Sequence, residues 1–226
     1  MENLDYAVKS VLPFLVTLLT VNTSLFAEII TVLPTDQKVV ALTFDACETE
    51  TPAFIDKQIV DFLVKEKIPF TIFVSGRFAQ TNRAEIAALA KYEFVELENH
   101  SVSHIQHMER LPNAQVLDES DDGFLQAITG RRTRFFRFPG GNCDRRTLSL
   151  VEKRYKVVHW TFPSGDADRR TSSKQLRDWV LAKTRPGSIL VFHINQRGYS
   201  TAAALPEIIR GLSSKGYAFV TLRDYL

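Results

Sequence analysis

From residue 38 onward, the chain alternates between short, mostly apolar runs and longer stretches in which apolar residues recur at helical spacing. The short runs have the length and the β-branched and aromatic content of strands. They cover residues 39–44, 70–74, 94–97, 134–138, 157–161, 189–192 and 219–222. Helical spacing is clearest at Ile55, Ile59, Phe62 and Leu63, and again at Leu205, Ile208, Ile209 and Leu212. This alternation predicts a parallel sheet covered by helices.

The predicted strands are apolar on both faces, which indicates that both faces of the sheet are buried. A closed, distorted (β/α)7-type barrel and an open doubly wound sheet both satisfy this pattern, and the number of strand–helix units favours the barrel. Pro52 and Pro206 suit the first turns of two helices. Since no internal repeat or linker-like segment interrupts the pattern, we expect an α/β fold in a single domain.

The first 27 residues differ from the rest. Residues 11–21 form an apolar run about half the ~20 residues needed to span a bilayer. Lys9 precedes this run, and small residues at Ser24 and Ala27 follow it. We interpret residues 1–27 as a signal peptide, with a buried N-terminal helix as the alternative. The expected product is an exported, periplasmic or secreted domain over residues 28–226, with no stable membrane span after cleavage.

Composition and the absence of certain motifs exclude several classes of protein. A net charge of +2 lacks the excess of basic residues typical of nucleic-acid-binding proteins. Two cysteines are too few for a disulfide-dense scaffold or a four-cysteine zinc site. The sequence has no G-x-S-x-G, P-loop or G-x-G-x-x-G motif, so serine-hydrolase chemistry and a nucleotide cofactor have no support.

Reactive side chains follow the predicted strands, where parallel α/β folds place their active sites. In chain order they are Asp45 and Glu48, His100 and His104, Arg137 before Pro139-Gly140-Gly141, Trp160 before Asp166 and Asp168, and His193. We expect them to ring one face of the sheet. His107 and His159 fit no role and are interpreted as structural.

Each of these groups has a chemical use. His100 and His104 are four residues apart, which places two imidazoles on one side of a helical turn, as a divalent metal requires. Asp45 is a candidate general base, and Arg137 would keep it ionised. His193 is a candidate general acid. Structural roles for these side chains are the plain alternative.

As an acid, His193 needs an orienting carboxylate, and Asp166 and Asp168 both offer one. We favour Asp166, because Ser164-Gly165 just before it makes a sharp turn.

At these residues the sequence resembles the polysaccharide deacetylases with a NodB-homology domain, carbohydrate esterase family 4. The resemblance rests on Thr43-Phe44-Asp45, the H-[ST]-x-x-H box from His100 to His104, and Arg137-x-Pro139-x-Gly141. Trp160 with the acidic loop and the strand leading into His193 complete it, so that it covers nearly all of residues 38–226. It implies a distorted (β/α) barrel that removes acetyl groups from sugar polymers with a divalent metal, often zinc.

The resemblance also implies individual roles. Asp45 is the base, His100 and His104 are metal ligands, Arg137 tunes the base, and His193 is the acid, with Asp166 as its partner. Trp160 lines the acetyl pocket, and Pro139 and Gly140 are expected to contact the substrate.

The sequence departs from the family at Ala46, where the family has a second aspartate that supplies the third metal ligand. We expect Asp45 or Glu48 to replace it, water next, and the thiolate of Cys47 last. Restoring a carboxylate with Ala46→Asp is expected to tighten metal binding. Cys47 and Cys143 either form a disulfide between two loops or remain free thiols, and the sequence favours neither.

We therefore expect an exported, metal-assisted hydrolase that deacetylates an N-acetylated carbohydrate polymer, such as peptidoglycan or a chitin-like glycan. A cytoplasmic small-molecule amidohydrolase on the same fold is one alternative. Another is a degenerate member that binds glycan without turning it over.

Overall fold

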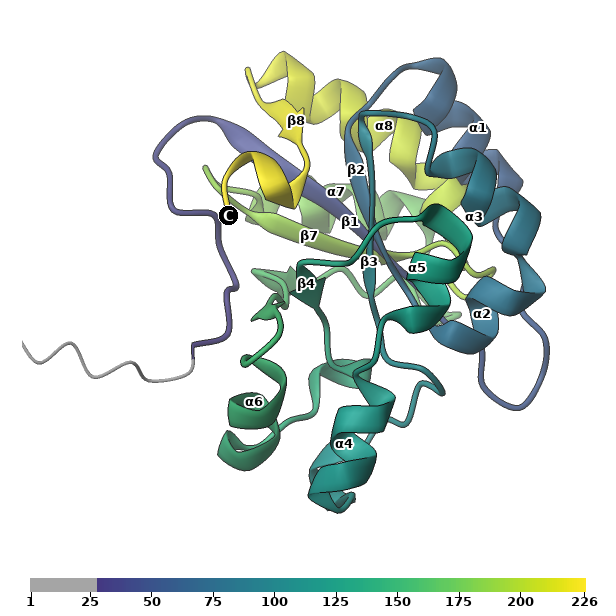
Figure 1. Cartoon of the computed structure of the whole chain (residues 1–226). Coiled ribbons are helices and arrows are strands. Elements are labelled where there is room, and N and C mark those ends of the chain that lie inside the picture. Colours follow the sequence, from purple (N-terminus) through teal and green to yellow (C-terminus); the bar gives the residue numbers. More distant parts are fainter. Residues whose placement is uncertain (1–27) are drawn as a thin grey trace, which may run out of the picture.

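The computed structural model describes residues 28–226, and the predicted signal peptide lies outside them. Its centre is an eight-stranded sheet in the order β5-β4-β3-β2-β1-β7-β6, with β8 paired to the start of β1 (Figure 1). Every strand pair is parallel. The strands are β1 (Val39–Ala46), β2 (Phe70–Val74), β3 (Val95–Asn99), β4 (Phe135–Phe136), β5 (Lys156–Val157), β6 (Phe162–Pro163), β7 (Ile189–His193) and β8 (Ala218–Val220).

The predicted parallel α/β fold in a single domain is confirmed, in the form of a curled half-barrel. Each predicted strand has a counterpart, but the predicted strand 157–161 is interrupted. β5 ends at Val157 and β6 begins at Phe162. Residues 30–33 run along this opening, because Ile30 bridges Val158, just after β5, and Val32 bridges Ser188, just before β7. The N-terminal segment thus links the two edges of the open barrel.

Eight α-helices connect or follow the described strands, and their caps explain where several begin. They are α1 (Lys57–Lys65), α2 (Gly76–Thr81), α3 (Arg83–Leu89), α4 (Asn113–Glu119), α5 (Gly123–Thr129), α6 (Arg145–Val151), α7 (Ser173–Lys183) and α8 (Thr201–Ser214). Asp56 caps α1 by accepting from the backbone N–H groups of Gln58 and Ile59. The two proline predictions were wrong. Pro52 precedes this cap, and Pro206 lies inside α8.

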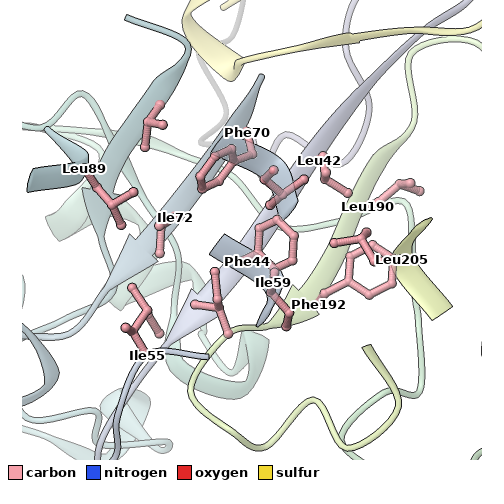
Figure 2. Packing of buried hydrophobic residues seen from close by; sticks show 14 of the residues in the cluster. Leu42, Phe44, Ile55, Ile59, Phe70, Ile72, Leu89, Leu190, Phe192 and Leu205 are labelled. Atoms are coloured by element: carbon pink, nitrogen blue, oxygen red, sulfur yellow. The ribbon is translucent and has the colours of Figure 1, made fainter. Parts of the chain in front are cut away.

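Alternation along β1 decides which side chains face the helices. Val40, Leu42, Phe44 and Ala46 belong to the large apolar cluster that packs against α1, α3, α7 and α8. Figure 2 shows this packing, with Phe44 and Phe192 on adjacent strands close to Ile59 and Leu205. A second cluster, which includes Val39, Ala41, Phe73 and Phe135, fills the inside of the curl.

The inward-facing side of β1 leads to the candidate site. Thr43 and Asp45 continue the phase of Val39 and Ala41, and all four are buried. Because the strands are parallel, their carboxyl ends meet at one end of the half-barrel, and the loops there carry the ionisable residues. No helix within residues 28–226 is long and apolar enough to cross a membrane.

Candidate active site

Arg137 lies at the centre of the polar side chains inside the half-barrel. It is fully buried, and its Nη1 donates to Asp45 Oδ1 at 2.8 Å. Its other donors bind Thr43 Oγ1 at 2.9 Å, the Val158 carbonyl at 3.2 Å and the His159 carbonyl at 2.9 Å. Four of the five N–H donors of this buried cation are therefore hydrogen-bonded, as burial demands. Its network holds Asp45 in one position.

Asp45 is an anion at neutral pH. Burial by itself would raise the pKa of its carboxyl, but the charges of Arg137, His100 and His193 outweigh burial and lower this pKa to about 2. Asp45 Oδ2, the oxygen that Arg137 does not bind, lies 3.7 Å from His100 Nε2. In the register of β1 and β7, Asp45 pairs with His193. The predicted base and acid therefore leave adjacent strands at the same level.

His193 and Asp166 form a second pair, in which Asp166 is buried and His193 is partly exposed to the cleft. The ring Nδ1 of His193 lies 2.9 Å from Asp166 Oδ1, and its backbone N–H donates to Asp166 Oδ2 at 2.7 Å. Ser164 Oγ donates to Oδ1 at 3.1 Å and Thr201 Oγ1 donates to Oδ2 at 2.7 Å. All four contacts bring a donor to the carboxylate. Asp166 therefore fixes the position and the tautomer of the imidazole.

The Asp166 pairing suits His193 to proton donation. Burial by itself would lower the pKa of His193, but the hydrogen bond to Asp166 and the charges of Asp166 and Asp45 outweigh burial and raise this pKa. Asp168, the other carboxylate that the sequence offered, is not near His193. It forms an ion pair with Arg170 on the surface at 2.8 Å.

The histidine pair is brought together by a loop. The sequence spacing predicted a helical turn, but residues 100–104 are not helical, and Ser101 and His104 have positive φ angles of 67° and 57°. Ser101 Oγ accepts from the backbone N–H of His104 at 3.0 Å and stabilises this bend. The two imidazole centroids lie 5.0 Å apart. The rings thus meet as predicted, although the local structure differs.

Both imidazoles are neutral and available as ligands. Burial dominates in lowering the pKa of His100, and burial together with His100 lowers the pKa of His104 to about 3. His100 Nδ1 lies 2.9 Å from the Arg137 carbonyl. Because a carbonyl only accepts, Nδ1 carries the hydrogen and Nε2 presents a lone pair. His104 Nδ1 is buried and has no hydrogen-bond partner among the described residues.

The third member of this group is Cys47. Among the described residues, Cys47, His100 and His104 form the group able to hold a metal ion, with one ligand atom from each lying within 4.8 Å of the others. Glu48 lies outside this group, and its Oε2 accepts from the Ala53 backbone N–H at 3.1 Å. The sequence had ranked Cys47 last among the replacements for the missing aspartate.

The two cysteines are free in the structure, so the disulfide is not formed. Burial raises the pKa of Cys47 to about 12 and that of Cys143 to about 11. A protonated thiol is a poor nucleophile, which argues against a thiol-based hydrolase. Cys143 packs at the edge of the apolar cluster around Phe136 and Phe138.

A cleft of about 740 Å³ opens above these groups. Among the residues predicted to contact substrate, Trp160 and Gly140 line it. Pro139 is buried and is not among the lining residues. Gly141, at φ 72°, lets the Trp160 ring pack closely, since a Cβ there would lie 2.8 Å from its Cη2. The His159 ring stacks on Trp160 with centroids 5.3 Å apart.

Comparison with known proteins identifies the family. The family model of polysaccharide deacetylases matches residues 33–159, which is more than half of the chain. The chain belongs to the polysaccharide deacetylase family. The resemblance inferred from the sequence is thereby confirmed. The matched segment contains Asp45, His100, His104 and Arg137, and ends before Asp166 and His193.

Similarity to individual relatives covers more of the chain than the family model does, and it includes the region of Asp166 and His193. The chain is 30% identical over 191 residues to a bifunctional xylanase/deacetylase from Pseudobutyrivibrio xylanivorans, covering 84% of this chain but only 30% of that protein. It is 27% identical to a peptidoglycan-N-acetylglucosamine deacetylase from Bacillus cereus, covering 86% and 91% of the two chains. The solved structure of the peptidoglycan deacetylase PdaC from Bacillus subtilis has a TM-score of 0.72 and 30% identity, over 84% and 90% of the two chains.

Asn195 and Arg169 of this cleft were not singled out as site residues from the sequence, which left Arg197 and Tyr199 open between substrate contact and an ordinary strand–helix loop. Asn195 donates through Nδ2 to the Cys47 carbonyl at 2.7 Å and to Cys47 Sγ at 3.2 Å. Arg197 and Tyr199 line the cleft from the loop after β7, and Arg169 stacks over the Tyr199 ring at 4.3 Å. The signal available was their position directly after a strand that ends in His193.

Proposed function

We propose that this protein is a metal-assisted deacetylase that removes acetyl groups from an N-acetylated carbohydrate polymer. The observation that carries the proposal is the pair of supported titrating groups on adjacent strands. Asp45 is held by Arg137, and His193 is held by Asp166, with their Cα positions paired in the sheet. A base and an acid on one cleft wall are what amide hydrolysis requires.

The imidazoles of His100 and His104 fit a divalent cation, because both are neutral, buried and close together. When bound there, such a cation, with zinc as our first choice, would supply a Lewis acid that polarises the acetyl carbonyl and acidifies the attacking water. The side chains of this protein carry out the proton transfers and hold the substrate.

Asp45 accepts the proton of the water that attacks the acetyl carbonyl carbon. Arg137 keeps this carboxylate charged and aimed at the cleft. His193 then donates its proton to the departing nitrogen as the C–N bond breaks, leaving acetate and a free amine. Asp166 stabilises the protonated imidazole until that transfer. Trp160 provides an apolar wall for the acetyl methyl group, and Gly140 leaves room beside it.

A cell-envelope glycan is the proposed substrate class. Several relatives are named as deacetylases of peptidoglycan or chitooligosaccharide, and a cleft of about 740 Å³ is large enough for more than an isolated acetyl group. Export through the segment 1–27 would bring the protein to such a polymer.

Acetate release tests the proposal. Purified, metal-loaded protein is offered peptidoglycan, chitooligosaccharide and monomeric N-acetylglucosamine. We expect acetate from at least one polymer and little from the monomer. Release from the monomer alone would favour a small-molecule amidohydrolase, and glycan binding without acetate would favour a non-catalytic member. Fractionation of the native cells tests export, since recovery only from the cytoplasm would contradict it.

A further inference from the structure

We infer that Cys47 is a ligand of the cation, so that this protein binds its metal through one thiolate and two imidazoles. The inference rests on the proposed function only in assuming that a cation binds in this cleft. The family has its metal-binding aspartate at the position of Ala46. Cys47 is the next residue along the chain.

The distances permit a three-ligand site. One atom from each of Cys47, His100 and His104 lies within 4.8 Å of the other two. With Zn–S bonds of about 2.3 Å and Zn–N bonds of about 2.0–2.1 Å, a tetrahedral zinc holds its ligand atoms roughly 3.3–3.6 Å apart. Side-chain adjustments of about 1 Å therefore close the group around an ion. Three protein ligands leave the fourth position open to the cleft, as in catalytic zinc sites.

Each ligand is already oriented or lacks another partner. Asn195 Nδ2 donates to Cys47 Sγ at 3.2 Å, and the Arg137 carbonyl fixes the His100 ring. His104 is only 8% exposed, and its Nδ1 has no hydrogen-bond partner within residues 28–226. An unpartnered buried nitrogen is costly, so His104 lacks the protein partner that a purely structural histidine would have at Nδ1. Such supporting contacts are typical of metal ligands.

The nearby carboxylates are not part of this group. Asp45 Oδ1 is held by Arg137, and its Oδ2 lies 3.7 Å from His100 Nε2, but Asp45 does not belong to the set of atoms close enough together to share an ion. Glu48 bonds the Ala53 backbone. Ala46, which stands where the family has its metal-binding aspartate, is fully buried in the apolar cluster on the helix side of β1. Ala46 is not among the residues that line the cleft. Cys47 is the first residue beyond the strand and lines the cleft.

The Cys47 thiol is protonated in the metal-free site, but a dication deprotonates a thiol that coordinates it. A thiolate in place of a carboxylate changes which metals bind. Sulfur and imidazole donors favour zinc and cobalt over magnesium and manganese, which prefer oxygen. The site should therefore discriminate strongly against Mg²⁺ and Mn²⁺.

Cobalt(II) substitution reads the ligand directly. A Co²⁺–thiolate bond gives an intense near-ultraviolet charge-transfer band that oxygen and nitrogen ligands do not give. We expect this band in the full-length protein loaded with one equivalent of Co²⁺, its loss in Cys47→Ser, and its retention in the matched control Cys143→Ser. In zinc-loaded protein, X-ray absorption should show one sulfur at about 2.3 Å.

Stoichiometric cobalt binding without the band, or a band that survives in folded Cys47→Ser, would overturn the inference. Either result leaves the deacetylase proposal standing, because acetate release is measured separately. A band without any acetate release would instead refute the proposed function and keep the thiolate site. The variant Cys47→Asp provides a further test of the ligand role. It should abolish the band and shift metal preference toward Mn²⁺, and an unchanged preference would count against a ligand role for residue 47.

Discussion

Replacing Asp166 by Asn removes one charge from the His193 pair while preserving side-chain size. The carboxylate accepts from four donors, two of them on His193. The amide of asparagine has an oxygen acceptor at only one of the two positions. Its NH2 group would therefore face one of the N–H donors of His193. Asp168→Asn is a matched control, because that residue also lies in the acidic loop but contacts the exposed Arg170.

The size of the effect follows from these bonds. A hydrogen bond to a charged group contributes about 1.5–3 kcal/mol. If that stabilisation serves the protonated imidazole in the transition state, losing it lowers the rate roughly ten- to hundredfold, at about 1.4 kcal/mol per factor of ten. Asp168→Asn should leave the rate unchanged, since surface ion pairs contribute little.

The pKa of His193 predicts the direction in which Asp166→Asn changes the pH dependence of stability and of rate. Because Asp166 raises the pKa of His193, its contribution to stability is fully present below the unfolded value of 6.5 and is lost as pH rises through the folded pKa. Asp166→Asn should remove this decline. In the rate profile, the alkaline limb should move to lower pH, because His193 loses its proton earlier.

Acetate release measured across pH, with circular dichroism to confirm folding, provides the assay. An unshifted alkaline limb in folded Asp166→Asn would show that Asp166 does not tune His193. An equal loss in Asp168→Asn would show that the effect comes from the charge of the loop.

Three further predictions concern other parts of the structure. Ala46→Asp places a carboxylate among buried apolar side chains and should destabilise the metal-free protein by about 3–5 kcal/mol in urea unfolding; unchanged stability would contradict this, and calorimetric titration separately tests the expected gain in metal affinity. Burial, and after it the charge of Glu96, raise the pKa of Glu98 to about 8. The free energy of unfolding of the wild type should therefore fall as pH rises from about 4.5 to 8, and Glu98→Gln should remove this decline. Gly141→Ala should displace Trp160 and lower kcat/KM, whereas Gly130→Ala, also at positive φ but with nothing within 4 Å, should cost only stability of about 1–2 kcal/mol. Equal kcat/KM in these two glycine variants would remove Trp160 from the pocket.

Much of the fold could be predicted because it depends on local patterns. The short apolar runs and the helical stripes are visible in the sequence, and β1, β2 and β7 coincide closely with the predicted runs. The edge strands β5 and β6 could not be placed, since the pairing of residues 30–33 with Val158 and Ser188 is a long-range event.

The candidate site was predictable in its members and less so in its geometry. Asp45 and His193 follow directly from strand ends. The backbone bend at Ser101 and His104 could not be foreseen, because positive φ at non-glycine residues has no clear sequence signal. The sequence could not show that Ala46 joins the apolar cluster with Phe44 whereas Cys47 lines the cleft beside the two histidines, so the ranking of the replacement ligands remains a prediction.

Acetate release by the wild type, Asp45→Asn, His193→Ala and the double variant, assayed side by side on one active polymer, tests most directly whether Asp45 and His193 act as base and acid. Each single substitution should lower kcat/KM about a hundred- to ten-thousandfold. The double variant should be little worse than the poorer single one, since groups that act in one step are not additive. Near wild-type release by either folded single variant would contradict the role assigned to that residue.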